Sequence, residues 1–479
     1  MKAIGGAVFT DHAAPAKEPL GSGVLTGNQR TSWGNDTVRP AVLFAILVGT
    51  TAPLTAAPAL SQTLQETLAR TLDANPGVQA AKAQVDAAEA RIRQARAAGL
   101  PQLGAGATYQ VGTGDYDPGP NGRALLGSLP SGPEDSLSLA GQNGSGRISA
   151  EAAIEQPIFT GLRIVNGIRG AKAASAAEDA RAALVRQRTG LAIADAYTGL
   201  VAARARLLAA QAAAERFGTE AGAARVRFDT GRNTRTDLSL AEAQAASADG
   251  LLAGAQAEVI AAQAQLTALT GTLPEPLSAA PPPVPATAEE AVAAALADAP
   301  ALRAARFASE AADAALRVAK GARSPQLSAR AAAQYAEDQF VTGDELTALT
   351  LTAQLRVPIF EGGAIGARIA EARAEARAAR FAADDARRAV EADARAAFAR
   401  YTAATLAEEA ARLRAEAAAL AAEGAGLERE LGQRNLQDTL AAIALGAEAR
   451  AAQADAGRAR VLAAYALRAA AGQPLVFAE

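Results

Sequence analysis

The chain has 479 residues, of which 50% are hydrophobic and only 4% aromatic, a composition that favours long, closely packed helices over several globular cores. Its formal net charge of −3 indicates no basic surface of the kind that nucleic acid requires. Because there is no cysteine and the one histidine is His12, thiol chemistry, Cys/His zinc sites and histidine-based triads are excluded, and we expect no enzyme, no cofactor and no catalytic or metal site.

The first 59 residues are predicted to be an N-terminal extension that ends in a signal peptide. An apolar stretch, Ala41 to Ala59, follows Arg39-Pro40 and ends in the small-x-small sequence Ala57-Pro58-Ala59. This order is typical of a secretory signal. A transmembrane anchor is the alternative, but the strongly apolar part is far shorter than the roughly 20 residues that span a bilayer.

The rest of the chain contains the same unit twice. Pro101-Gln102-Leu103 recurs as Pro325-Gln326-Leu327, and Pro157-Ile158-Phe159 recurs as Pro358-Ile359-Phe360. The first offset is 224 (325 − 101) and the second is 201 (358 − 157), so one insertion of 23 residues (224 − 201) separates two repeats in register. We therefore divide the chain into repeat 1, a proline-rich linker, repeat 2 and a tail, at residues 60–271, 272–286, 287–472 and 473–479.

Each repeat is predicted to begin with a helix followed by a β-hairpin. Apolar positions have helical spacing from Ser61 to Ala98 and from Thr287 to Ala322, and Pro101 and Pro325 stop these helices. Apolar and polar residues then alternate, most clearly from Leu349 to Val357, which indicates strands. The hairpins occupy residues 100–160 and 325–360, with strands at 102–111, 147–157, 326–335 and 349–357. The insertion falls in the turn 112–146, which we expect to be an exposed loop.

The longest helices follow the hairpins. They run from Gly161 to about Asp229 and from Gly363 to about Glu430, or roughly 100 Å each at 1.5 Å per residue. Tight turns at Gly231 and Gly432 interrupt them, and shorter return helices follow at about 234–270 and 435–471. No globular domain needs helices of this length.

Four strands of about ten residues cannot close a barrel in lipid, which needs at least eight strands and no free edge. Three copies would supply twelve strands, and their paired helices would continue the barrel as a tube. The predicted fold is mainly α with a β-barrel part, assembled as a trimeric 12-stranded barrel and an α-helical tube. The alternative is a coiled-coil scaffold without a pore, in which the hairpins cap a helical rod.

The duplicated helix, hairpin, helix, helix order resembles the TolC family of trimeric outer-membrane efflux ducts. The sequences QPIFTG at Gln156 and VPIFEGG at Val357 carry the resemblance, together with the turns from Gly231 to Asp237 and from Gly432 to Asp438. It implies an exit duct in the outer membrane that extends into the periplasm and serves a tripartite efflux pump or a type I secretion system. The implied partners are a periplasmic adaptor, an inner-membrane pump and outer-membrane lipid, with no nucleic acid.

The resemblance also implies a periplasmic gate at the two tip turns. Its residues would be Thr236, Asp237, Arg434 and Asp438, with Arg434 facing Thr236 and Asp237. The alternative is that both aspartates only cap the return helices. Two positions depart from the family pattern, because Arg429 stands where an aromatic gate residue would be and Ala441 stands at a second acidic position.

A last group of residues is predicted at the junction of barrel and helices. Pro157 and Pro358 should terminate strands, because proline cannot donate to a ladder. Phe159 and Phe360 would lie near the periplasmic rim, where aromatic side chains favour the membrane interface, or would pack at the joint itself. Carboxylate pairs such as Asp384-Asp385 and Glu408-Glu409 are interpreted as solvated helix faces.

Overall fold

The computed structural model describes residues 62–111, 146–275, 277–337 and 345–477. The chain divides into two compact units, Met1–Pro58 and Ala59–Glu479. The predicted signal peptide and the insertion loop at 112–145 lie outside the described residues. The account below concerns the second unit.

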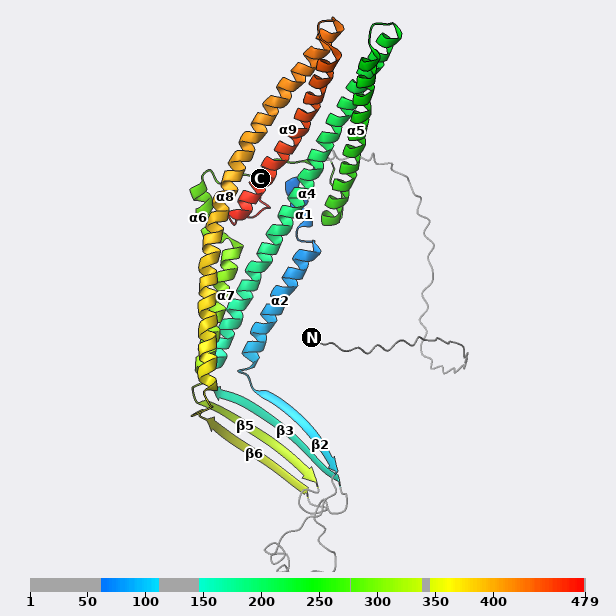
Figure 1. The fold of residues 1–479 in the computed structure, drawn as a ribbon. Helices are drawn as coiled ribbons and strands as arrows, with labels where there is room; N and C mark the ends of the chain where they lie inside the picture. The colour runs from blue at the N-terminus through cyan, green and yellow to red at the C-terminus, as the bar shows by residue number, and fades with distance from the viewer. Residues whose placement is uncertain (1–61, 112–145, 276, 338–344, 478–479) are drawn as a thin grey trace, which may run out of the picture. The chain divides into compact units, whose positions relative to one another are not determined.

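Both repeats have the same order of elements, which confirms the internal duplication (Figure 1). Helices α4 and α8 have 67 residues each. Repeat 1 consists of β1 (Gln62–Thr63), α1 (Leu64–Thr71), α2 (Pro76–Ala97), β2 (Gln102–Val111), β3 (Gly146–Phe159), α4 (Arg163–Asp229) and α5 (Arg235–Thr270). Repeat 2 and the linker before it consist of β4 (Leu277–Ser278), α6 (Ala288–Asp298), α7 (Pro300–Gly321), β5 (Gln326–Glu337), β6 (Glu345–Arg356), α8 (Ala364–Glu430) and α9 (Leu436–Ala470).

The first helix of each repeat is broken in two, where the sequence predicts one continuous helix. The breaks fall before Pro76 and Pro300, which become the first residues of α2 and α7. A residue that precedes proline is disfavoured in the α region, and proline is well suited to a first helical position. In repeat 1 the Asn75 side chain caps the new start, since its Oδ1 accepts a hydrogen bond from the Gly77 N–H at 2.9 Å.

The four longer strands form one antiparallel sheet in the order β2-β3-β5-β6. Strands β3 and β5 join the two repeats, with Ile154 opposite Ala331. An ion pair between Arg330 and Glu151 crosses the same pair of strands. Strand β6 begins at Glu345, four residues before the predicted start. Three of its leucines are 64–83% exposed: Leu349, Leu351 and Leu355. The edges of the sheet, β2 and β6, have no partner strand in the described part of the chain.

Pro157 does not terminate its strand, contrary to the prediction. Strand β3 continues to Phe159, with an irregularity between Pro157 and Phe159 where it pairs with β5. The pairing of β3 with β2 ends at Glu155, which lies opposite Gln102. Pro157 therefore needs no hydrogen bond on that side and is tolerated. In repeat 2, β6 ends at Arg356 and Pro358 follows the strand as predicted.

Helix α4 is the central element of the helical part. It packs against α2 and α5 of its own repeat and against α7 and α9 of repeat 2. Tyr197 of α4 and Tyr465 of α9 are fully buried in this core. The Tyr197 hydroxyl donates to the Ser278 carbonyl at 3.0 Å and accepts from the Ser278 N–H at 2.8 Å, which fixes the linker strand β4. None of the helices in the described ranges has a stretch that is both apolar and long enough to span a bilayer.

The tail packs against the linker through one buried cation. The Arg468 guanidinium of α9 donates to the Pro474 carbonyl at 2.9 Å and to the Pro283 carbonyl at 2.6 Å. It also lies 4.3 Å from the centre of the Phe477 ring. Burial lowers the pKa of Arg468. Just before the tail, Gly472 has a φ of 72°, and a Cβ added to it would lie 2.7 Å from the Ala299 nitrogen.

Candidate functional site

The two tip turns have the same backbone geometry. Gly231 and Gly432 follow α4 and α8 with φ angles of 71° and 77°, in the left-handed region that glycine adopts without strain. After each glycine, a backbone N–H reaches back over the helix end, from Arg232 to the Arg227 carbonyl at 2.7 Å and from Gln433 to the Glu428 carbonyl at 2.8 Å. This pattern satisfies carbonyls at a helix end and reverses the chain.

Both aspartates of the predicted gate lie in the first turn of the return helices, three residues after the N-cap residues Thr234 and Asn435. The Asp237 carboxylate accepts hydrogen bonds from the Thr234 N–H at 3.1 Å and the Thr234 hydroxyl at 2.8 Å. These bonds lower the pKa of Asp237. The Asp438 carboxylate accepts from the Asn435 side chain at 2.9 Å. Asp237 thus accepts from a backbone N–H, as the capping role predicts, whereas the Asp438 carboxylate contacts the side chain of Asn435, whose Oδ1 accepts from the Asp438 N–H at 2.8 Å. Thr236, which precedes Asp237, is exposed.

Arg434 has a different partner from the predicted one within this single chain. Its Nε atom lies 3.3 Å from the Glu428 carboxylate in the last turn of α8. Among the residues that the structure describes, it forms no ion pair with Asp237. Any contact between Arg434 and Asp237 would thus require another state of the turns or another copy of the chain.

The most buried ion pair near the tips, among the described residues, is one that the sequence analysis missed. Nε of Arg429 lies 3.0 Å from the Glu220 carboxylate, and the two side chains are only 7% and 19% exposed. Burial is the main cause that lowers the pKa of Arg429, although Glu220 opposes it. The pair joins α8 to α4, and so joins the two repeats. One feature of the sequence pointed to this contact: Arg429 stands where the family pattern has an aromatic residue.

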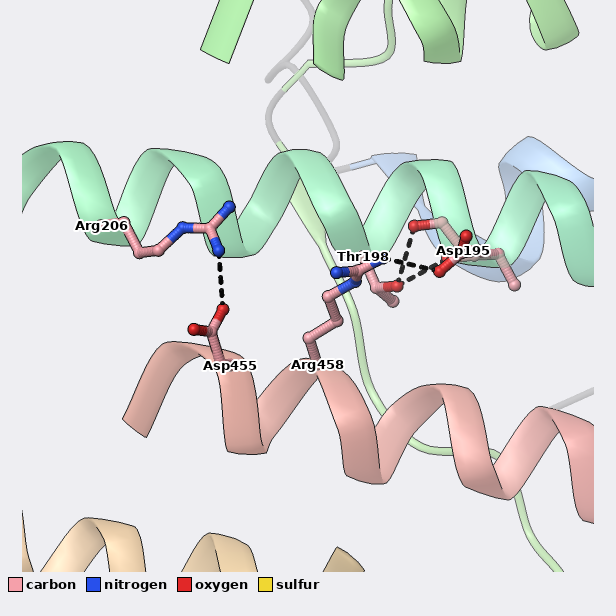
Figure 2. Close-up of polar contacts among 6 residues, drawn as sticks. Asp195, Thr198, Arg206, Asp455 and Arg458 are labelled. Atoms are coloured by element: carbon pink, nitrogen blue, oxygen red, sulfur yellow. Dashed lines mark hydrogen bonds and ion pairs between the residues drawn. The ribbon is translucent and has the colours of Figure 1, made fainter. Parts of the chain in front are cut away.

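Two further ion pairs join the repeats along α4 and α9, as Figure 2 shows. Arg206 lies 2.9 Å from Asp455, and Arg458 lies 2.8 Å from Asp195. Arg206 also pairs with Glu258 of α5 at 3.1 Å. We call the surface along which α4 packs on repeat 2 the inter-repeat seam; with Glu220–Arg429 it contains three ion pairs between helices.

The carboxylate pairs expected on solvated faces behave in two ways. Asp385 and Glu409 pair with arginines of their own helix, in agreement with the prediction. Glu408 instead pairs with Arg460 of α9, and its side chain is only 30% exposed. The interpretation of Glu408 as a solvated residue was therefore wrong. Its partner lies 52 residues away in the sequence, so helical spacing could not reveal the contact.

The two junctions between strands and long helices have different surroundings. Phe159 ends β3 and is 45% exposed, whereas Phe360 precedes α8 and is 86% exposed. Gly161 has a φ of 62°, and a Cβ there would lie 2.6 Å from the Gly321 carbonyl at the end of α7. Gly362, which is equivalent to Gly161 (362 − 161 = 201), has no described atom within 4 Å of that position. The junction before α4 is therefore packed against the end of α7, whereas no described residue packs at the equivalent position before α8.

Comparison with known proteins identifies a family, a relative in sequence and several solved structures with the same fold. The sequence model of the family described as outer membrane efflux protein matches residues 67–272 and 291–473. The outer membrane efflux protein BepC of Brucella suis biovar 1 is 31% identical over 166 residues, 34% of this chain and 36% of that protein, so the match spans about a third of BepC.

Solved structures show the same fold. A membrane protein from Pseudomonas aeruginosa has a TM-score of 0.71 at 20% identity, and the alignment covers 86% of this chain and 90% of that one. For the outer membrane protein VceC of Vibrio cholerae the TM-score is 0.70 at 19% identity, covering 86% and 96%. For the outer membrane channel MtrE of Neisseria gonorrhoeae it is 0.69 at 20% identity, covering 86% and 89%. Since the family model covers most of the described residues, the chain belongs to the outer membrane efflux protein family, as the resemblance to the TolC family predicted.

Proposed function

We propose that three copies of this chain form one continuous exit duct, with a barrel in the outer membrane and a helical tube in the periplasm, for an efflux pump or a type I secretion system. The observation that carries the proposal is the four-stranded sheet with two free edges, attached to helices of 67 residues. Unpaired strand edges are not stable in lipid, so the sheet needs further strands. Three sheets joined through β2 and β6 give twelve strands without an edge.

The exposed leucines of β6 support a lipid environment for the sheet. Leu349, Leu351 and Leu355 lie on one face, because side chains two residues apart in a strand point the same way. Leaving apolar surface in water costs about 25 cal/mol per Å², whereas hydrocarbon accepts it. The opposite face of the strand has Thr350, Thr352 and Gln354, which suit a wet barrel interior.

The proposed partners follow from this placement. Outer-membrane lipid would surround the sheet, while a periplasmic adaptor would dock at the turns of Gly231 and Gly432, opposite the end that continues into the strands. The adaptor would connect the duct to an inner-membrane pump. The duct itself would be passive, with no catalytic residues and no nucleic acid as a partner.

The decisive test is reconstitution of the purified protein. We expect heat-sensitive trimers in detergent and discrete conductance steps in planar lipid bilayers. A coiled-coil scaffold without a pore would form no such conductance, even if it were folded and helical by circular dichroism. Folded protein that never conducts would therefore favour the scaffold.

Within this duct we propose that the tip turns form the gate. In the closed state Arg434 would leave Glu428 and bind Thr236 or Asp237 of the facing turn, while three Asp438 carboxylates would surround the mouth. Charge-assisted hydrogen bonds contribute roughly 1.5 to 3 kcal/mol each when shielded and much less when exposed. The threefold arrangement would let these small contributions act together.

The gate proposal predicts the behaviour of a double variant. Arg434→Ala with Asp237→Ala should raise single-channel conductance and antibiotic leakage without lowering the yield of trimers, because the links of the closed state are lost. Asp438→Ala should chiefly weaken block by cations, which a ring of carboxylates concentrates. Arg388→Ala with Asp385→Ala is the matched control, since it removes the same charges from an exposed pair on α8. Equal conductance of the gate variant and this control would place the gate elsewhere.

A further inference from the structure

A cleft beside the inter-repeat seam is not used by the proposed duct. It has a volume of about 690 Å³, and its walls come from α4 of repeat 1, from α8 and α9 of repeat 2 and from the linker. Clefts of roughly 300 to 1,000 Å³ have the size that binds small molecules. All the lining residues belong to one chain, so the walls are complete without a second copy.

One wall of the cleft is apolar. The lining residues of α4 recur every three or four positions from Thr198 to Ala209, and so they share one face of the helix. This face contributes Val201 and Leu208, and Leu208 is 67% exposed. The linker adds the ring of Pro281. A wall of this kind favours a ligand with an apolar body, because binding removes apolar surface from water on both sides.

The other wall is rich in arginine. One arginine comes from α8 and three come from α9: Arg412, Arg450, Arg458 and Arg460. Three of the four have carboxylate partners: Glu409 and Glu416 for Arg412, Asp195 for Arg458 (Figure 2) and Glu408 for Arg460. Arg450 is exposed and forms no ion pair within the part of the chain that the structure describes. One cation is therefore free at the cleft.

The paired arginines of α9 also keep donors for an anion. The Nε atoms of Arg458 and Arg460 have no acceptor among the described residues, and the two side chains remain 36% and 33% exposed. Gln453 lies between these residues and Arg450 on α9, lines the cleft and is half-buried. A guanidinium with unused N–H groups binds an anionic oxygen more strongly than a neutral acceptor.

The duplication shows that paired helices of this kind pack without the arginines. Subtracting 201 from the three arginines of α9 gives their equivalents in α5, which are one acidic and two apolar residues: Asp249, Ala257 and Val259. Helix α5 packs along α4 with these residues, just as α9 packs along α8. The arginine cluster is thus no requirement of the helix pair, which favours a local role at the cleft.

We propose that this cleft binds a small organic anion, with one carboxylate, sulfonate or phosphate group on an apolar body. The anionic group would lie at Arg450 and Gln453, and the body would lie against the α4 wall and Pro281. Because these walls belong to different repeats and to the linker, the bound molecule would brace the inter-repeat seam. The site belongs to a single chain and so goes beyond the proposed duct.

The charges of the cleft favour a single anionic group over a polyanion. Glu408 and Glu409 line the same wall as the arginines, and their carboxylates would repel any further negative charge. A neutral apolar molecule would cover Arg450 without giving it a counter-charge, which is unfavourable. The ligand therefore needs both parts, one anionic group and one apolar body.

Protection of an introduced thiol tests the site, since the chain has no cysteine of its own. Ala205→Cys places a thiol on the α4 wall. In the full-length protein in non-ionic detergent, saturating naphthalenesulfonate should slow alkylation of this thiol by iodoacetamide about tenfold, because only the unoccupied cleft reacts. Neutral naphthalenesulfonamide and inorganic sulfate should leave the rate nearly unchanged, since each has only one of the two parts.

A second reporter controls for effects of the probe on the detergent. Ala444→Cys places a thiol at an exposed position of α9 that does not line the cleft. Its alkylation rate should be the same with and without naphthalenesulfonate.

Charge variants in the Ala205→Cys background assign the anionic end of the ligand. Arg450→Gln removes the free cation and should abolish protection, whereas Arg450→Lys keeps the charge and should retain it. Arg388→Gln changes an arginine of α8 that lies outside the cleft and should behave as the parent protein. Circular dichroism of each variant confirms that the chain is folded.

A filling variant tests the cleft without changing any charge. A Cβ added to Gly457 would lie 3.6 Å from Oε1 of Glu408, an ordinary contact, so a larger side chain there would extend into the cleft. Gly457→Leu should therefore abolish protection, and the helix should tolerate it because leucine has a higher helix propensity than glycine.

Four results would overturn the proposal. They are an unchanged rate with naphthalenesulfonate, equal protection by the neutral sulfonamide, protection by sulfate alone, and protection that survives in folded Arg450→Gln. The first would remove the site, the second and third would change the class of ligand, and the fourth would remove the role of Arg450. Conductance in planar bilayers is measured separately, so the proposed duct can fail or hold independently of these results.

Discussion

Replacing Gly472 with alanine is expected to lower the free energy of unfolding by about 2–5 kcal/mol. An L-residue in the left-handed region costs about 1–2 kcal/mol, and overpacking adds roughly 1–3 kcal/mol. The added Cβ would meet backbone, at 2.7 Å from both the Ala299 nitrogen and the Asp298 carbonyl carbon. Backbone at the break between α6 and α7 cannot move aside as a flexible side chain can. Denaturant titration of the detergent-solubilised protein, followed by circular dichroism, measures the loss.

The equivalent glycine of repeat 1 is the matched control. Gly271 has a φ of 75°, close to that of Gly472, but no described atom lies within 4 Å of its Cβ position. Gly271→Ala should therefore lower the free energy of unfolding by only about 1–2 kcal/mol, the cost of placing alanine in the left-handed region. Equal losses at both positions would contradict the packing argument and leave backbone conformation as the sole cause.

Glu220→Ala should have the second large effect and lower the free energy of unfolding by about 3–5 kcal/mol, because the Arg429 cation would remain buried without its partner. Arg429 is 7% exposed, and burial lowers its pKa. Truncating both partners, as Glu220→Met with Arg429→Met, should cost much less than Glu220→Ala alone, since apolar replacement of a buried pair is often close to neutral.

The exposed pair on α8 serves as the reference for this experiment. The Arg388 and Asp385 side chains are 74% and 79% exposed, and Asp385→Ala should change stability by no more than about 1 kcal/mol. Denaturation midpoints of the three variants decide the question. If Glu220→Ala were as mild as Asp385→Ala, the contact between α4 and α8 would not contribute to holding the repeats together.

Local signals in the sequence predict the long elements well. The start of α4 and α8, their length and the turns at Gly231 and Gly432 depend on helix-forming composition and on glycine at a left-handed position, which the residues themselves specify. The breaks at Pro76 and Pro300 were missed because the apolar spacing continues across both prolines. The continuation of β3 through Pro157 depends on where its neighbour β2 ends, and the sequence of β3 alone does not contain that information.

The ion pairs between the two repeats could not be predicted from local sequence patterns. Arg206 and Asp455 lie 249 residues apart, and which arginine of an alanine-rich helix meets which carboxylate depends on the packing of α4 on α9. The gate residues illustrate the same limit. The bond between Asp237 and the Thr234 N–H spans three residues and could be predicted, whereas the partner of Arg434 in a closed channel depends on how copies meet.

The buried Arg468 has a consequence for the making of the protein. Its hydrogen-bond acceptors are the carbonyls of Pro283 in the linker and Pro474 in the tail, and residues 473–477 are synthesised after every helix. A chain that stops at Gly472 would bury a guanidinium with its tail acceptor missing and without the Phe477 ring beside it. Chains that lack the tail would therefore be unstable where Arg468 is buried and more open to proteases, so the protein becomes durable only after residues 473–477 have been made.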